Sequence, residues 1–370
     1  KNTIYCFIGL YMLNLFNIAE IVEKGEKKMK IGILCPSEIA FRRFLPALQK
    51  CEDYQYIGVA VADVEEWFGR TPEEVGKDKY EPVLAKEREK AETFEKQYGG
   101  KIFSSYRELI QSDETEAVYI PLPPALHYKW AKLALECGKH VLVEKPSTTD
   151  AGHTAELVEI AKKNGLALHE NYMFAFHDQL KAINNIVEQG ILGDVRLYRI
   201  NFGFPRRAKN DFRYVKALGG GALLDCGGYT LKYASMLLGS TARIAYSHLN
   251  YTDEFDVDLY GSAAMINDQG VTVQISFGMD NSYKCELEIW GSEGCLTTGR
   301  ILTAPAGFVP NYKIVKGQEV ITENLPADDT FYKSLQHFKK CIENQETRID
   351  TYQTIQRQAD LVEEFIKKAV

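Results

Sequence analysis

From Lys30 onward, short apolar runs alternate with segments of helical spacing, and this alternation constrains the fold more than any other feature. The apolar runs are short, as expected for strands that are buried on both faces. They lie at Lys30–Leu34, Tyr56–Ala62, Ala117–Ile120 and His140–Val143. Amphipathic segments at Lys86–Tyr98 and Leu126–Cys137 supply helical crossovers. The order predicts the α/β class, with an N-terminal Rossmann doubly wound parallel sheet.

After Pro146 the pattern changes to longer segments in which apolar and polar residues alternate with period two. Such segments are typical of a mostly antiparallel open sheet with one solvent-facing or partner-facing side. They lie at Val195–Phe204, Arg243–Asn250, Asp258–Met265, Val271–Phe277 and Glu286–Trp290. We therefore expect a Rossmann dinucleotide-binding domain at 29–148 and a C-terminal α/β domain at 149–370 for substrate binding and dimerisation.

The first 28 residues require a separate interpretation. The segment 4–22 is apolar, but it contains Asn14 and Asn17 and shows no small-residue cleavage site. Met29 directly precedes a predicted strand, and the codons for Gly25-Glu26 can resemble a bacterial ribosome-binding site. We therefore expect residues 1–28 to be an extension produced by start-site assignment, with Met29 as the native start.

Net charge and cysteine content limit which kinds of partner this chain can bind. The net charge of −7 disfavours nucleic acid, which needs a basic face to neutralise phosphates. The eight cysteines are scattered without the close spacing of zinc or redox motifs. We expect reduced thiols, a cytoplasmic location, no metal site and no membrane partner.

The loop after the first strand stands where a dinucleotide fold binds phosphates. At the three key positions of the fingerprint G-x-G-x-x-G/A it carries Cys35, Ser37 and Ala40, of which only Ala40 is a tolerated match. Ser37 could hydrogen-bond a phosphate at the helix N-terminus, and an ordinary strand–helix turn explains the loop equally well. The candidate cofactor-binding residues here are Cys35, Ser37, Glu38 and Ile39.

Asp63 ends the second predicted strand, close to the position of the acid that accepts from the adenosine ribose hydroxyls. Val64 follows it, where an arginine would favour a 2′-phosphate. NAD or NADP is therefore the expected cofactor, with NAD slightly favoured, although Asp63 could instead be a solvated turn residue. The segment 64–85 contains scattered glycines and prolines and reads as an irregular insertion without assigned chemistry.

A proline-rich segment follows the strand at Ala117–Ile120, at the sheet edge where ligands bind in such folds. Its prolines remove backbone donors and force an extended path. Pro121, Leu122 and Pro123 are candidate cofactor contacts. His127 either faces the cofactor or caps the next helix.

The strand His140–Val143 ends in Glu144-Lys145-Pro146. A charged pair at the end of a core strand is unfavourable unless it meets partners or solvent in a cleft. Glu144 and Lys145 are therefore candidates for the cofactor side of a site, and Lys145 for proton transfer with a lowered pKa. A surface ion pair is the alternative.

A glycine run opens the segment Leu218–Leu238 and leads to Asp225 and Tyr229, four residues apart and on one face of a helix. Gly227 and Gly228 inside it imply a close approach, for which a substrate or cofactor ring is the natural candidate. We expect Tyr229 to exchange a proton, with its pKa lowered by Lys145, and Asp225 to bind a substrate hydroxyl or orient the lysine. A purely structural glycine-rich helix is the alternative.

Three weaker candidates complete the predicted substrate site. Tyr172 and His177 follow a strand that should end at the same cleft, and Arg213 lies close before the glycine run. The other basic residues at 206–209 are interpreted as a solvated face.

These motifs together resemble the glucose–fructose oxidoreductase / inositol dehydrogenase / MocA family, from about Met29 to the C-terminus. Glu144-Lys145-Pro146 matches the family's Glu-Lys-Pro signature, whose lysine is catalytic. Asp225 and Tyr229 match its Asp-x-x-x-His motif with tyrosine in place of histidine. The same replacement occurs in the dihydrodiol dehydrogenase and nucleotide-sugar 3-ketoreductase branches, where the tyrosine is taken as the proton donor.

The resemblance implies an NAD(P)-dependent oxidoreductase that moves a hydride between nicotinamide and a hydroxyl or keto carbon of a sugar or nucleotide-sugar. It also implies a homodimer or homotetramer, because the open sheet of the family often forms an interface. Cys35 departs from the glycine usual at that position. Two alternatives remain open: a non-catalytic sensor or regulatory protein that binds the cofactor, and a dihydrodiol-type dehydrogenase.

Overall fold

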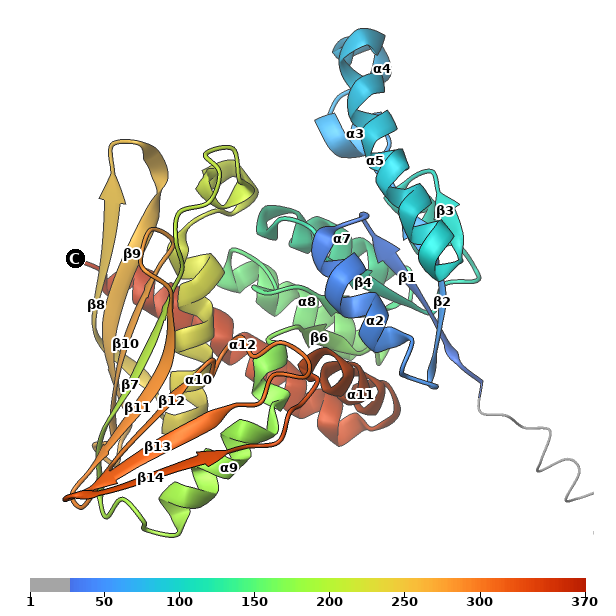
Figure 1. Cartoon of the computed structure of the whole chain (residues 1–370). Coiled ribbons are helices and arrows are strands. Elements are labelled where there is room, and N and C mark those ends of the chain that lie inside the picture. The colour runs from blue at the N-terminus through green and yellow to red at the C-terminus, as the bar shows by residue number, and fades with distance from the viewer. Residues whose placement is uncertain (1–26) are drawn as a thin grey trace, which may run out of the picture.

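The computed structural model describes residues 27–370, so the expectation for the N-terminal extension falls almost wholly outside it. Six parallel strands form the first sheet in the order β3-β2-β1-β4-β5-β6 (Figure 1). Their bounds are β1 Met29–Leu34, β2 Tyr54–Ala60, β3 Lys101–Phe103, β4 Ala117–Ile120, β5 His140–Val143 and β6 Leu168–Glu170. The predicted Rossmann sheet is confirmed, and reversal of strand order at β1 and β4 opens a ligand crevice at their carboxyl ends.

The helices between these strands follow the predicted crossovers. They bury apolar faces against the sheet, whose central strands β1 and β4 are almost completely shielded from solvent. The helical elements are η1 Ala40–Phe44, α2 Leu45–Leu48, α6 Tyr106–Gln111, α7 Pro124–Glu136 and α8 Ala151–Asn164. The loops that carry Cys35, Asp63 and Lys145 leave the carboxyl ends of β1, β2 and β5.

The predicted irregular insertion is helical, which corrects the sequence interpretation. It forms α3 Val64–Phe68, α4 Pro72–Val75 and the first part of α5 Lys77–Tyr98. Asp63 with Glu66, and Thr71 with Glu74, form capping boxes that satisfy free N–H groups at the first two helix starts. These helices extend outward from the parallel sheet, above it in the view of Figure 1.

The second sheet has eight strands in the order β14-β13-β12-β11-β7-β10-β9-β8. Strands β7 and β10 run parallel, and the other neighbouring pairs are antiparallel, as predicted. Helices α10 (Gly228–Leu238) and α12 (Gln345–Lys368) cover one face (Figure 1). The strands are β7 Val195–Gly203, β8 Arg243–Thr252, β9 Phe255–Ile266, β10 Thr272–Gly278, β11 Lys284–Gly291, β12 Cys295–Gly299, β13 Asn311–Lys316 and β14 Glu319–Asn324.

The parallel sheet extends beyond residue 148, the predicted end of the first domain. Strand β6 pairs with β5, and α11 (Thr330–Glu343) packs beside η1, α2 and β6. Helix α9 (Asp178–Glu188) begins the part of the chain that leads to the second sheet. Within residues 27–370, no helix combines the length and the apolar character needed to cross a bilayer.

Candidate active site

Lys145 and Asp225 form a mostly buried ion pair between the two sheets. Strand β5 delivers Lys145 at its carboxyl end, and the π-helical turn η5 (Leu223–Gly227) delivers Asp225. Lys145 Nζ lies 2.7 Å from both Oδ1 and the backbone oxygen of Asp225. Their side chains are 13% and 14% exposed, so both groups keep some access to solvent. Two acceptors on one residue fix the direction of the ammonium group.

Arg213 completes this charged group. Its Nε donates to Asp225 Oδ2 at 2.6 Å, and its Nη1 donates to Asp211 Oδ1 at 3.1 Å. Burial raises the pKa of Asp225, but the nearby charges of Lys145 and Arg213 outweigh it and hold that pKa well below its ordinary value. Asp225 therefore remains ionised and positions two cations.

Tyr229 lies beside the lysine. Lys145 Nζ is 5.0 Å from the centre of the Tyr229 ring, so the predicted approach of these two side chains is observed. The phenol oxygen lies 3.9 Å from Met173 Sδ, a weak contact that leaves the hydroxyl hydrogen available. The ring packs edge-on against Tyr172 and Phe202, which sets its orientation.

The expected lowering of the Tyr229 pKa is wrong. Burial raises that pKa well above its ordinary value, and the charges of Glu144 and Asp225 raise it further. The charge of Arg213 lowers it less strongly and does not reverse the shift. Tyr229 is therefore a protonated phenol, the form that can donate a proton to an oxygen.

Glu144 is held by two hydrogen bonds at the end of β5. Tyr119 Oη and Asn171 Nδ2 donate to Glu144 Oε1 at 2.6 and 2.7 Å. Burial raises the Glu144 pKa, whereas these bonds and the charge of Lys145 lower it less strongly. The network connects β4, β5 and the segment after β6, and it braces the turn that carries Lys145.

Protein side chains, rather than a ligand, account for the close approach predicted at Gly227 and Gly228. A Cβ atom on Gly228 would lie 2.2 Å from Tyr172 Oη, and one on Gly227 would lie 3.0 Å from the ring of Phe277. The sequence predicted the close approach correctly but not what makes it. The two glycines let the start of α10 pack directly against Tyr172 and Phe277.

We predict that Gly228→Ala lowers the free energy of unfolding by about 1–3 kcal/mol, because Tyr172 is buried and must move. Urea unfolding measures this change. Gly299→Ala is the control, since a Cβ there meets no atom within 4 Å. Equal stability of Gly228→Ala and the wild type would contradict the packing described here.

Asp258 of β9 holds the start of η5. Its Oδ2 accepts from Leu223 N at 2.7 Å. Burial raises the pKa of Asp258 to about 6 despite the backbone hydrogen bonds that lower it. Asp258 is thus a positioning residue for Asp225, because it holds Leu223, two residues before Asp225.

This raised pKa predicts a measurable pH effect. The unfolded chain releases the Asp258 proton near its ordinary value of 3.8 and the folded chain near 6, so folded-state stability falls as pH rises through this window. The Asp258→Asn variant should lack this loss, which amounts to about 3 kcal/mol between the two limits. Unfolding titrations of both proteins at pH 4 and 7 measure it, and parallel pH profiles would contradict the assignment.

The sequence leaves two roles open for His127, facing the cofactor or capping the next helix, and its cofactor role stays a prediction. His127 is completely buried, and its two ring nitrogens lie 2.7 Å from the backbone oxygens of Leu122 and Pro146. Burial lowers the pKa of His127 to about 4, although its hydrogen bonds to the two backbone oxygens act in the opposite direction. His127 therefore joins the proline-rich loop to the turn after Lys145. Of the predicted contacts in this loop, Pro121 and Leu122 are buried, and Pro123 is half-buried at the helix start.

The backbone of the loop after β1 has a conformation that suits dinucleotide binding. Cys35 has φ of 84°, the left-handed conformation for which glycine is favoured, at a fingerprint position where glycine is usual. Ser37 Oγ accepts from Ala40 N at the helix start, and Ile39 is half-buried in the first turn. Glu38 is exposed and pairs with Arg42. The degraded fingerprint therefore retains its geometry.

Asp63 stands in a hollow of about 380 Å³ at the carboxyl end of β2. One oxygen, Oδ1, accepts from Glu66 N, and Oδ2 has no donor among the described residues. Tyr80 and Arg88 of α5 also line this hollow, as does Ser104. The hollow has the position expected for the adenosine end of NAD or NADP, and the free oxygen of Asp63 can accept from ribose hydroxyls. The insertion supplies part of its lining.

The other two predicted substrate residues, Tyr172 and His177, lie in different surroundings. Tyr172 is buried against Tyr229, whereas His177 caps α9 by accepting from Gln179 N and lies near Asp328. Their substrate-binding roles stay predictions. Arg206 pairs with acidic residues, as expected for a solvated face.

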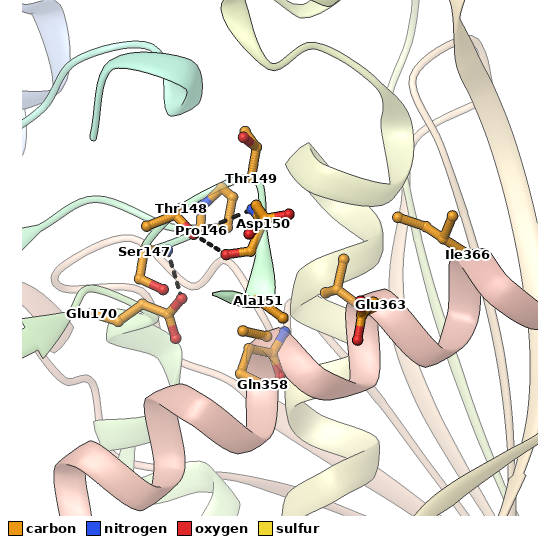
Figure 2. Close-up of a pocket in the computed structure, with 12 residues that line it drawn as sticks. Pro146, Ser147, Thr148, Thr149, Asp150, Ala151, Glu170, Gln358, Glu363 and Ile366 are labelled. Atoms are coloured by element: carbon orange, nitrogen blue, oxygen red, sulfur yellow. Dashed lines mark hydrogen bonds between the residues drawn. The ribbon is translucent and has the colours of Figure 1, made fainter. Parts of the chain in front are cut away.

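A separate cavity of about 110 Å³ lies between the start of α8 and α12 (Figure 2). Ser147 N donates to Glu170 Oε1 at its wall. Glu170 Oε2 and Gln358 Oε1 are buried without a hydrogen bond among the described residues, although Lys232 Nζ lies 3.8 Å from Glu170 Oε2. Neither Lys145 nor Tyr229 lines this cavity. Its size suits water molecules that satisfy these acceptors, so we do not assign it to the substrate.

Three residues that build the site escaped sequence analysis: Tyr119, Asp211 and Asp258. Each acts through a partner that only the fold brings near. A weak signal was available for Tyr119, a lone hydroxyl in an otherwise aliphatic strand.

Comparisons with known proteins agree with this geometry. Residues 57–172 match the oxidoreductase family with an NAD-binding Rossmann fold, and residues 180–297 match the Gfo/Idh/MocA C-terminal domain. The chain is 37% identical over 318 residues to dTDP-3,4-didehydro-2,6-dideoxy-alpha-D-glucose 3-reductase of Streptomyces violaceoruber, which covers 85% of this chain and 86% of that protein. It is 28% identical to trans-1,2-dihydrobenzene-1,2-diol dehydrogenase of Sus scrofa, over 78% of this chain and 88% of that protein.

A solved 3-ketoreductase from Actinomadura kijaniata, in complex with NADP and TDP-benzene, superposes with a TM-score of 0.83. It is 32% identical, and the match covers 93% of this chain and 98% of that one. With the lysine–aspartate–tyrosine group at the edge of a confirmed Rossmann sheet, these findings establish that the chain belongs to the Gfo/Idh/MocA family and is an NAD(P)-dependent oxidoreductase.

Proposed function

We propose that this enzyme reduces the keto group of a nucleoside-diphosphate sugar, with Lys145, Asp225 and Tyr229 as its central residues. The observation that carries the proposal is the position of the Lys145 ammonium, 5.0 Å from the Tyr229 ring and fixed by Asp225. The 3-ketoreductases among the relatives support the substrate class.

The nicotinamide cofactor supplies the hydride to the carbonyl carbon. Negative charge then develops on the carbonyl oxygen, and the ammonium of Lys145 stabilises it. Tyr229 donates its hydroxyl proton to that oxygen, giving the alcohol. Asp225 and Arg213 keep the ammonium in place throughout, and Glu144 braces the turn from the other side.

Absorbance of the reduced nicotinamide tests this proposal with a panel of nucleotide-linked keto sugars, free keto sugars and trans-dihydrodiols. We expect turnover of the nucleotide-linked sugars at a kcat/KM at least about 100-fold above that for the free sugars, because binding of the nucleotide contributes to transition-state stabilisation. Preferred turnover of dihydrodiols would favour the dehydrogenase alternative. Cofactor binding without any turnover would favour a sensor.

Cofactor choice follows from Asp63. Its carboxylate accepts from ribose hydroxyls in NAD and repels the 2′-phosphate of NADP, so we propose a modest preference for NAD. Asp63→Ser should raise the ratio of kcat/KM for NADPH to that for NADH by about 10-fold, because about 1.4 kcal/mol of repulsion disappears. Serine retains the helix cap. Glu65→Gln, on the exposed side of α3, is the control and should leave the ratio unchanged.

We further propose that the open face of the second sheet joins copies of this chain. Tyr246, Tyr260 and Trp290 are 51%, 45% and 53% exposed, and they alternate with buried residues on β8, β9 and β11. Exposed aromatic residues on one sheet face are typical of an interface. Light scattering on the purified protein should give the mass of a dimer or tetramer.

A further inference from the structure

A second polar cluster lies outside the active site, between β6 and α11. One ring nitrogen each of His169 and His337 and the Sγ of Cys341 lie within 4.8 Å of one another. His337 and Cys341 are four residues apart on α11, so they share one helix face, and His169 meets them from β6. Sequence spacing could not reveal this group because about 170 residues separate its two parts.

Hydrogen bonds fix which nitrogen of His169 is free. Ser334 Oγ donates its single hydrogen to Asn171 Oδ1, so it must accept from His169 Nε2–H, at 2.9 Å. The Nδ1 atom of His169 then carries a lone pair. That atom is buried and has no hydrogen-bond partner among the described residues, and His169 as a whole is only 2% exposed. An unpaired buried acceptor of this kind is unfavourable unless something binds it.

Thr351 orients the other two residues in the same way. Its Oγ1 donates to Thr347 O, so it accepts from His337 Nε2 at 3.2 Å and from Cys341 Sγ at 3.1 Å. The remaining lone pairs on the His337 ring and the Cys341 sulfur are left for a further partner. A histidine that binds a metal usually donates its other ring hydrogen to an oxygen acceptor, which fixes the orientation of the ring.

We propose that His169, His337 and Cys341 bind one transition-metal ion, with Zn²⁺ as the expected occupant. Two imidazoles and one sulfur suit Zn²⁺ and exclude Mg²⁺ and Ca²⁺, which prefer oxygen ligands. Coordination would draw the three donor atoms from 4.8 Å or less to roughly 3.3–3.6 Å, the separation that tetrahedral Zn–N and Zn–S bonds require. The Cys341 thiol releases its proton to solvent as the metal–sulfur bond forms.

The metal would connect α11 to the parallel sheet and, through hydrogen bonds, to the active site. Ser334 links His169 to Asn171, and Asn171 donates to Glu144 at the end of β5. A bound ion would therefore stabilise the arrangement of three elements that brace the Lys145 turn. The proposed function does not depend on this site.

Cobalt binding tests the proposal, because Co²⁺ replaces Zn²⁺ and a cobalt–thiolate bond gives a near-ultraviolet charge-transfer band. The full-length protein is freed of metal with a chelator and titrated with Co²⁺. We expect about one cobalt per chain with this band, and competition by Zn²⁺ but not by Mg²⁺. The thermal midpoint of unfolding should rise on addition of Zn²⁺.

Matched variants make the outcome specific. Cys341→Ser should lose the charge-transfer band and weaken cobalt binding by about 100-fold or more, and His337→Gln, at a half-buried position, should weaken it similarly. Cys51→Ser, at another buried cysteine of the same hydrophobic core, should retain both properties. Circular dichroism establishes that each variant is folded. Absence of cobalt binding in the folded wild type, or an unchanged band in Cys341→Ser, would overturn the proposal.

Discussion

Lys145→Met should lower kcat by about 1,000-fold or more while cofactor binding changes only a few-fold. The substitution keeps the apolar stem but removes the ammonium that stabilises negative charge on the carbonyl oxygen. Asp225 and Arg213 remain paired, so the local fold should persist. Steady-state kinetics with the best substrate of the panel, together with a cofactor titration by fluorescence, measure the two effects separately.

Lys139→Met is the matched control for this prediction. Lys139 precedes β5 at its opposite end, where its ammonium donates to the backbone oxygens of Ser112 and Thr115. It is far along the strand from the carboxyl edge, so its loss should change stability but not kcat. Activity above a tenth of the wild-type value in Lys145→Met would contradict the catalytic assignment.

Tyr229→Phe should reduce kcat by about 100-fold or more with little change in KM, because it removes only the proton donor. The hydroxyl has a weak sulfur contact at 3.9 Å, so its removal should change the free energy of unfolding by less than about 1 kcal/mol. Kinetics and urea unfolding of the same preparation distinguish lost chemistry from lost structure.

Tyr233→Phe is the control on the same helix, one turn further along α10. Its ring is buried and packs edge-on against Phe174, away from Lys145. We expect wild-type kcat in this variant. Equal losses in the two variants would indicate a packing effect and would argue against Tyr229 as the proton donor.

The fold was predictable where local pattern and tertiary environment agree. Strands β4 and β5 have the predicted bounds because both are short apolar runs buried on both faces. The start of α5 was missed because Gly76 and Pro82 are signals of irregular structure. In the structure Gly76 ends the capped helix α4, and Pro82 lies inside α5. The hairpin of β13 and β14 was missed because most of its residues are exposed: β13 buries only Tyr312 and Ile314, and β14 buries none of its residues fully.

The candidate site divides in the same way. Lys145, Asp225 and Tyr229 could be predicted because a charged pair ending a core strand and glycines inside a helix are locally unfavourable. The direction of the Tyr229 pKa shift could not, since it depends on burial of the ring and on the charges of Glu144 and Asp225, which only the fold brings near. For the same reason, the structural role of His127 between two loops required the fold.

The most direct test of the central claim is a crystal structure of the enzyme with oxidised cofactor and the alcohol product. The account predicts one product oxygen within about 3 Å of both Lys145 Nζ and Tyr229 Oη. An oxygen that contacts neither atom, with the hydroxyl of Tyr229 still directed at Met173, would contradict it.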